Sequence, residues 1–274
     1  MLTIRYTQEC REAAEGRLPV GPDGKTPVSI KVQENWWLEN VFGRAHPITP
    51  IIWFGPVAAY GLWRGSHAGL LRTAGLFLAG WLIWSLLEYM LHRYIFHFRP
   101  KNEAERLQAF LLHGYHHSFP NDRTRLVAPP WMSWPPGLAI LGLYHLAFPA
   151  DVAWNLFAGT TLGYVGYDWI HYYTHHFKPR NPIGKWLRAY HLQHHHSDDH
   201  SRYGVSSPLW DYVFGTVQSL MSLTNFERSS PSLFQSIVSM MPSAQARTAV
   251  GPSTSTTSQV TAPDSTITRI FAIS

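Results

Sequence analysis

Four apolar segments, arranged in two pairs, dominate the first two thirds of the chain. Residues 47–63 contain no charged residue, and residues 68–91 contain only Arg72 and Glu88. The second pair covers residues 131–148 and 152–170, separated by the short turn 149–151. An apolar run of about 20 residues can cross a bilayer as a helix. The pattern predicts an all-α, multi-pass membrane protein with about four transmembrane helices in two hairpins.

Polar sequence flanks these segments on both sides and divides the chain into three parts. The sequence of residues 1–46 predicts a mostly irregular arm that ends in a short helix near Trp36 and Trp37. This helix is expected to lie either on the bilayer surface or on the protein surface. Residues 47–220 form the predicted membrane-embedded domain, and the Ser/Thr-rich residues 221–274 are predicted to be disordered. The N-terminus lacks the apolar core of a signal peptide, so membrane insertion is expected from internal segments.

The composition favours a membrane over nucleic acid as the partner. Charged residues make up 14% of the chain, against about 25% in soluble proteins. The net charge is +5, but the basic residues form no cluster of the nucleic-acid-binding kind. The only cysteine is Cys10, which excludes an intrachain disulfide and a thiolate zinc finger and fits a cytosol-facing site.

Thirteen of the sixteen histidines fall between residues 92 and 196, and ten of them have metal-ligand spacing. Helical positions three or four apart share a face, so each cluster can aim several imidazoles one way. Ten ligands suit two ions with about five nitrogens each, drawn from Fe, Cu, Ni or Zn. His92 and His97 lie about 140° apart on a regular helix and should reach different metals. The candidate ligands are His92, His97, His113, His116, His117, His171, His175, His191, His194 and His195.

The predicted topology places all four histidine clusters on one side of the membrane. Two spans, an even number, separate the second cluster from the third, so the clusters can meet. Basic residues flanking the spans on that side assign it to the cytosol. The expected location is the endoplasmic reticulum membrane in a eukaryote or the inner membrane in a bacterium. The basic residues are Arg99, Lys101, Arg106, Lys178, Arg180, Lys185 and Arg188.

Histidine-held metals beside a bilayer suit activation of O2 for attack on a lipid C–H bond. Iron is expected for activity, although zinc can occupy such nitrogen ligands in purified protein. About residues 80–216 resemble the fatty acid 2-hydroxylase branch of the membrane fatty acid hydroxylase and sterol desaturase superfamily. The motifs that carry the resemblance are EYMLHRYIFH, LLHGYHH, DRTRLVAPP, GYDWIHYYTHH, YHLQHHH and YGVSSPLWDYVFGT.

The resemblance implies a di-metal centre with ten histidine ligands, held in a cytosolic helical cap above four transmembrane helices. It implies hydroxylation at C2 of a long acyl chain, either in a ceramide-type sphingolipid or in a free fatty acid. It also implies a division of the ligands: one metal is held by His92, His113, His116, His191 and His194, and the other by His97, His117, His171, His175 and His195.

Carboxylates are expected to orient the imidazoles by accepting their free N–H groups. The candidates are Glu88, Asp122, Asp168 and Asp211, and for Asp168 a solvated carboxylate at a helix end is an equal alternative. His145 is expected to be a core histidine without a metal. His176, His196 and His200 extend the clusters and are expected to support the ligands or to be exposed.

Electrons are expected from a separate donor. Many members of the family carry a fused cytochrome b5 domain marked by HPGG, whereas the only His-Pro here, at His46, is followed by Ile48 and Thr49. The expected donor is a separate cytochrome b5 or ferredoxin-type protein that draws on NAD(P)H. The alternatives are a sterol desaturase or C4-methyl oxidase of the same superfamily, a membrane metal transporter and, least favoured, histidines that bind no metal.

Overall fold

The protein is helical wherever its structure is described. The computed structural model describes residues 4–197, 200–217 and 235, and no strand occurs in these ranges. A single isolated antiparallel bridge there joins Tyr6 and Gln33. The predicted all-α class is therefore confirmed. The predicted disordered tail, 221–274, lies outside the described residues except for residue 235.

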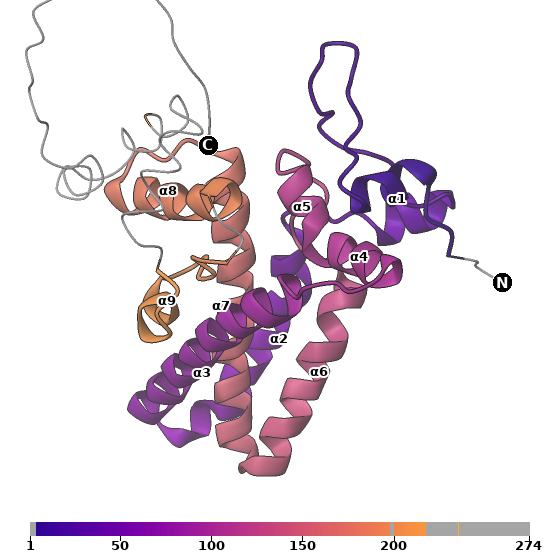
Figure 1. Cartoon of the computed structure of the whole chain (residues 1–274). Helices are drawn as coiled ribbons and strands as arrows, with labels where there is room; N and C mark the ends of the chain where they lie inside the picture. The colour runs from indigo at the N-terminus through magenta and orange to yellow at the C-terminus, as the bar shows by residue number, and fades with distance from the viewer. Residues whose placement is uncertain (1–3, 198–199, 218–234, 236–274) are drawn as a thin grey trace, which may run out of the picture.

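Four long helices run side by side and form the lower body of the molecule (Figure 1). They are α2 (Thr49–Gly65), α3 (Leu70–Met90), α6 (Pro130–Ala147) and α7 (Ala150–His176), and α7 contacts the other three. The short 3-10 turn η2 (Ser66–Ala68) joins α2 to α3. In the described residues one helical stretch, 70–96, is long and apolar enough to cross a membrane by length and composition.

Glycines set how closely the helices around α7 approach it. A Cβ on Gly80 of α3 would lie 2.1 Å from the carbonyl oxygen of Leu156, and one on Gly159 of α7 would lie 2.0 Å from that of Phe77. No side chain fits in these places, so the backbones of α3 and α7 are in direct contact. Helix α6 has no buried residue and packs against α7 less closely.

Short helices cover one end of the four-helix body (Figure 1). They include α4 (Glu103–Ala109) and α5 (Tyr115–Ser118), joined by the π-helical turn η4 (Phe110–Gly114), and α8 (Pro182–Ser197). Asn102 caps α4, because its side chain accepts the Glu105 backbone N–H at 2.9 Å. A further π-helical turn, η3 (Leu91–Phe96), extends α3, and α9 (Leu209–Val213) ends the described main body.

The N-terminal arm is more ordered than the sequence predicts. It contains α1 (Gln8–Ala14) as well as the π-helical turn η1 (Leu38–Phe42). Cys10 and Ala13 of α1 are buried against Phe110 and Phe119 of the α4–α5 region, and burial raises the pKa of the Cys10 thiol to about 11. A helix of seven residues has too little apolar periodicity to be recognised in the sequence, and tertiary packing stabilises it.

Candidate metal centre

Ten histidines converge in two groups of five. In each group one ligand atom per residue lies within 4.8 Å of all the others. The groups adjoin, because the rings of His117 and His195 stack at 4.2 Å. The first group is His92, His97, His113, His117 and His194, and the second is His116, His171, His175, His191 and His195.

The spacing of the Nε2 atoms fits one metal ion in each group. In the first group His92 Nε2 lies 3.0 Å from His113 Nε2 and 3.2 Å from His97 Nε2. In the second group the distances from His116 Nε2 to His171 Nε2 and His195 Nε2 are 2.9 and 3.0 Å. At a metal–nitrogen distance of about 2.0–2.1 Å, ligands at right angles lie about 3 Å apart and opposite ligands about 4.2 Å apart.

The imidazoles are held in the neutral form that binds metals. Burial lowers the pKa of His194 to about 4, although its hydrogen bond to Ser201 opposes this. Burial, with repulsion from neighbouring imidazoles, also lowers the pKa values of His116, His191 and His195 well below the ordinary value. The centre therefore offers uncharged nitrogen donors at neutral pH, the set expected for iron, copper, nickel or zinc.

The grouping differs from the division that the family resemblance implies. His97 and His117 lie in the first group rather than the second, and His116 and His191 lie in the second rather than the first. The prediction that His92 and His97 reach different metals is therefore wrong.

A π-helical turn explains why His92 and His97 share a group. The His97 backbone N–H donates to the His92 carbonyl at 3.1 Å, which is the i→i+5 bond of a π-helix. Residues five apart then lie one above the other instead of about 140° apart. Such turns are often found at functional sites.

The remaining pairs follow a simple helical rule that could have been applied to the sequence. Residues four apart share a helix face. Each such pair belongs to one group: His113 with His117, His171 with His175, and His191 with His195. His116 and His194, which have no partner four residues away among the ten, complete the two groups.

Backbone carbonyls of the segment 201–207 orient two ligands of the first group. His92 Nδ1 donates to the Tyr203 carbonyl at 2.5 Å, and His194 Nδ1 donates to the Ser201 carbonyl at 2.7 Å. These bonds fix the tautomer that leaves Nε2 free for a metal. The sequence does not reveal this role, because a backbone carbonyl leaves no signal in residue type.

Glu88 and Asp211 hold this segment in place. Glu88 accepts the backbone N–H groups of Val205 and Ser206, both at 2.8 Å, and Asp211 accepts those of Tyr203 and Gly204 at 2.9 and 2.8 Å. Glu88 and Asp211 therefore bind the backbone of this loop and not, as predicted, the imidazoles themselves. They fix the loop, and the loop carbonyls fix the imidazoles.

Arg202 places the two carbonyls that accept from the ligands. Its φ of 57° is in the left-handed region, which is unfavourable for a residue with a side chain. The Arg202 backbone N–H donates to the Thr216 carbonyl at 3.0 Å, and Thr216 Oγ1 in turn donates to Asp211 at 2.7 Å. The unusual conformation is thus stabilised by the same carboxylate network.

The other two candidate carboxylates have different surroundings. Asp122 accepts hydrogen bonds from the hydroxyls of Tyr115 and Thr124, both at 2.7 Å, and from Arg125 at 3.2 Å. It organises the loop after α5. Asp168 is buried, which excludes the alternative of a solvated helix-end carboxylate.

The extra histidines lie outside both groups. His145 bonds to the Leu141 carbonyl at 3.0 Å and packs against Trp154, but it is exposed rather than in a core as predicted. His176 is half-buried beside Tyr172, and His196 and His200 are exposed.

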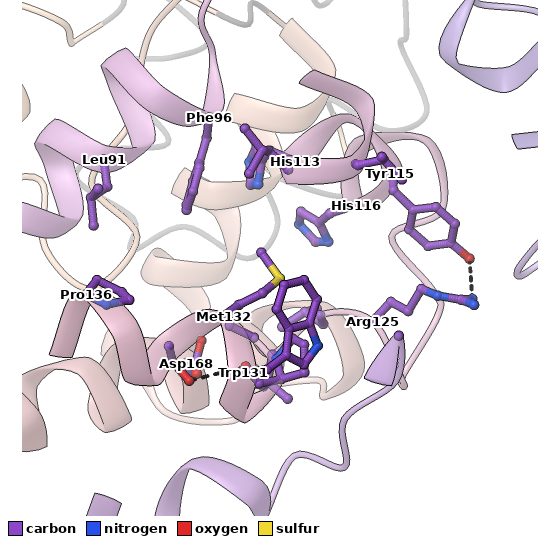
Figure 2. A pocket seen from close by; sticks show the side chains of 18 of the residues that line it. Leu91, Phe96, His113, Tyr115, His116, Arg125, Trp131, Met132, Pro136 and Asp168 are labelled. Atoms are coloured by element: carbon purple, nitrogen blue, oxygen red, sulfur yellow. Dashed lines mark hydrogen bonds between the residues drawn. The ribbon is translucent and has the colours of Figure 1, made fainter. Parts of the chain in front are cut away.

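A cavity of about 1030 Å³ opens beside the metal centre. His113, His116 and His171 form part of its wall, and most of the remaining wall is apolar. In Figure 2 the rings of His113 and His116 lie above Met132, Trp131 and Asp168. The volume is at the upper end of the roughly 300–1000 Å³ of small-molecule sites, so a long flexible ligand fits.

The chain is similar in sequence to known fatty acid hydroxylases. The sequence model for "Fatty acid hydroxylase" matches residues 77–216. The dihydroceramide fatty acyl 2-hydroxylase FAH2 of Arabidopsis thaliana is 42% identical over 173 residues, which cover 62% of this chain and 73% of that protein. The human fatty acid 2-hydroxylase is 40% identical over 150 residues, covering 52% of this chain and 39% of that protein.

A solved structure is also similar. The hydroxylase domain visible in full-length scs7p has a TM-score of 0.64 and 35% identity, and the match covers 68% of this chain and 70% of that one. The chain belongs to the fatty acid hydroxylase family.

Proposed function

We propose that this chain catalyses the O2-dependent hydroxylation of C2 in long acyl chains, carried by a ceramide-type sphingolipid or present as free fatty acids. The observation that carries this proposal is the position of the two five-histidine groups at the wall of a largely apolar cavity. The names of the Arabidopsis and human relatives supply the reaction and the substrate class.

The residues of the chain have separate tasks in this reaction. Two iron ions, if bound, would supply the redox chemistry that reduces O2 and oxidises an unactivated C–H bond. The ten imidazoles would hold these ions without adding charge, and the segment 201–207 keeps the Nε2 atoms of His92 and His194 turned toward the place of the ions. The apolar wall takes up the hydrocarbon and excludes bulk water from the site.

Iron is the proposed metal for activity, with zinc as a possible occupant in purified protein. Electrons are proposed to come from a separate cytochrome b5 or ferredoxin-type donor that draws on NAD(P)H. Basic residues exposed at the metal end of the molecule, including Lys101 and Lys178, offer a surface for an acidic donor protein.

The four long helices are proposed to span a membrane. Large apolar side chains are exposed on their outer faces, including Ile52 at 60%, Leu78 at 65% and Leu146 at 86%. Such a surface is unfavourable in water and favourable in lipid. The basic residues near the histidine clusters support a metal centre on the cytosolic side. The membrane is that of the endoplasmic reticulum in a eukaryote or the inner membrane in a bacterium.

Mass spectrometry of sphingolipid acyl chains tests the proposal. The chain is expressed in cells that lack their own hydroxylase, beside the variants His117→Ala, which removes a ligand, and His145→Ala, which changes a histidine outside both groups. We expect 2-hydroxyacyl lipids with the unchanged chain and with His145→Ala, and at least about a hundredfold less with His117→Ala. Altered sterols without hydroxylated acyl chains would instead support the sterol-oxidase alternative.

A further inference from the structure

We propose that the seam between α6 and α7 holds the acyl chain, with its methyl end against Phe157 and Ile140, and that this floor sets the acyl length accepted. The inference rests on the proposed function, because it assumes that C2 of the acyl chain is presented to the metal centre. It adds the residues that determine the length of the substrate.

One face of α7 lines the cavity from the metal centre downward. Phe157, Thr161, Tyr164, Asp168 and His171 all contribute to the wall. Their spacings of three and four place them on one helix face. His171 and Phe157 are fourteen residues apart, which corresponds to about 21 Å along the axis. This depth is close to the length of an extended long-chain acyl group.

Helix α7 packs so tightly against α3 and α2 that we place the acyl chain between α7 and α6. On the α3 side, a Cβ on Gly163 would lie 2.7 Å from Trp84 Cβ, and the backbones touch at Gly80 and Gly159. On the α2 side, a Cβ on Gly61 would lie 3.0 Å from the Trp154 carbonyl oxygen. Helix α6, without a buried residue, supplies Met132, Pro136, Gly137 and Ile140 to the cavity wall.

A hydrogen-bonded cross-link bridges the seam near its lower end. Tyr144, one turn beyond Ile140 on α6, bonds to Thr160 of α7 through the two hydroxyls at 2.9 Å. Thr160 also donates to the Gly80 carbonyl of α3 at 3.1 Å. Phe157 lies one turn below Thr160, is 3% exposed and lines the deepest part of the wall on α7. The methyl end of a bound chain therefore meets the Phe157 ring, the sec-butyl side chain of Ile140 and the hydrogen bond between Tyr144 and Thr160.

A side chain introduced at Gly137 would project into the middle of the seam. It lines the cavity between the metal end of α6 and Ile140, and a Cβ there would meet only the Phe54 ring, at an ordinary contact distance of 3.9 Å. A larger side chain at this position can enter the space of the acyl chain. Gly142 on the same helix is exposed, and a Cβ there would meet nothing within 4 Å. Gly142 is thus the matched control.

The test measures the acyl lengths of the 2-hydroxylated products. Full-length variants are expressed in cells that lack their own hydroxylase but make sphingolipids with a wide range of acyl lengths. The variants are Gly137→Leu, Gly137→Ala, Phe157→Ala and Gly142→Leu. Each methylene that loses its apolar contact weakens binding about fourfold. The hydroxylated fraction is determined for each acyl length by mass spectrometry.

We expect Gly137→Leu to reduce hydroxylation of the longest chains at least about tenfold relative to the shortest, and Gly137→Ala to do so less. We expect Phe157→Ala to shift the products toward longer chains and Gly142→Leu to match the unchanged protein. Products with an unaltered length distribution in the active Gly137 and Phe157 variants would overturn the proposed floor. Absence of 2-hydroxyacyl products from the unchanged chain would overturn the proposed function, and the floor with it.

Discussion

At the scale of single residues, the orientation of the metal ligands depends on groups that touch no metal. His92 and His194 each use one ring nitrogen for a backbone carbonyl of the segment 201–207. That segment is fixed by Glu88 and Asp211, which accept its backbone N–H groups. Because the imidazoles cannot turn without moving the loop, the carboxylates determine how well the first group is formed.

Replacement of Asp211 by Asn should weaken one metal site selectively. Asn can accept from only one of the two backbone N–H groups that Asp211 Oδ1 and Oδ2 now bind, so the loop and its carbonyls shift. Loss of such a supporting contact typically costs about 10–100-fold in metal affinity. Titration with a chelator, followed by elemental analysis, should show one of two metals released at about tenfold or more lower chelator concentration.

Asp151→Asn is the control for this experiment. Asp151 forms a partly exposed ion pair with Arg72 at 3.3 Å, at the end of the bundle away from the histidines. Its replacement should leave both metals bound as in the unchanged protein. Equal chelator sensitivity of Asp211→Asn and the unchanged protein would show that the loop does not hold the ligands.

At this scale the sequence predicts the ten candidate ligands, which the structure brings together, but it does not predict how they divide into two groups. The ten histidines were recognisable because imidazoles at helical spacing are concentrated in a short part of the chain. Their division between two groups depends on the π-helical turn after α3, and residue type alone does not predict such a turn. The left-handed Arg202 and the accepting carbonyls of Ser201 and Tyr203 are backbone features, which the sequence does not encode in a recognisable motif.

At the scale of elements, the N-terminal arm is attached to the α4–α5 region by a buried ionic network. Arg125 forms ion pairs with Glu39 of the arm and with Asp122, the latter at 3.2 Å, and donates to Tyr115 at 3.1 Å. Glu39 also accepts the backbone N–H groups of Val32 and Gln33 at 3.1 and 2.9 Å. Arg125, Glu39 and Tyr115 line the cavity, so the arm forms part of the proposed substrate site.

Replacement of Arg125 by Met should release the arm. Removing one partner of a buried ion pair leaves the other charge uncompensated and costs about 3–5 kcal/mol. Cys10, fully buried in α1, reports this opening, because the thiol reacts only when the arm detaches. We expect at least about a hundredfold faster reaction of Cys10 with a maleimide in the variant.

Arg106→Met tests whether any lost arginine contact has this effect. Arg106 pairs with Glu15 of the arm at 3.1 Å, but both side chains are substantially exposed, at 40% and 27%. An exposed pair contributes about 0–1 kcal/mol, so the Cys10 reaction should accelerate at most about fivefold. Similar rates in the two variants would contradict the assigned importance of the buried network.

Acidic pH should weaken the attachment of the N-terminal arm to the α4–α5 region. Burial alone would raise the pKa of Glu39, but hydrogen bonds from Gln33 and Arg125 hold its pKa below the ordinary value. A carboxyl with a lowered folded-state pKa contributes stability above its unfolded pKa and loses it as the pH falls through the folded value. The thermal unfolding midpoint should therefore fall from neutral pH to about pH 3, and less so in Glu39→Gln. Parallel curves for both proteins would refute this role.

The sequence predicted the long helices and missed the arm for related reasons. The segments that became α2, α3, α6 and α7 are apolar over most of their length, which is a strong signal. The arm is polar, and its helix α1 is short, so its order arises from contacts with residues about 100 positions away, such as Phe110. Such non-local packing has no periodicity that a sequence displays.

At the scale of the whole molecule, the apolar side chains exposed on the four long helices and the distribution of charge favour one orientation of the protein in a membrane. The proposed four spans place the turn between α2 and α3 on the side opposite the metal centre. Ser66 lies in that turn and Lys178 follows α7 at the histidine end, and both are exposed. These two positions therefore report the two faces of the membrane.

Cysteine labelling can test the topology directly, because the chain contains only Cys10. In a Cys10→Ser background, Ser66→Cys and Lys178→Cys are treated with a membrane-impermeant maleimide in sealed vesicles. We expect one position to react in intact vesicles and the other only after permeabilisation. Reaction of both from the same side would rule out the proposed arrangement.

The most direct test of the central claim is the fate of the atoms at C2. Purified, iron-loaded protein in lipid nanodiscs is given an electron donor, oxygen-18 gas and an acyl lipid in which deuterium replaces both hydrogens on C2. We predict a 2-hydroxy product that contains one oxygen-18 atom and keeps one deuterium, and no product from His117→Ala. A product hydroxylated elsewhere, or oxygen derived from water, would contradict it.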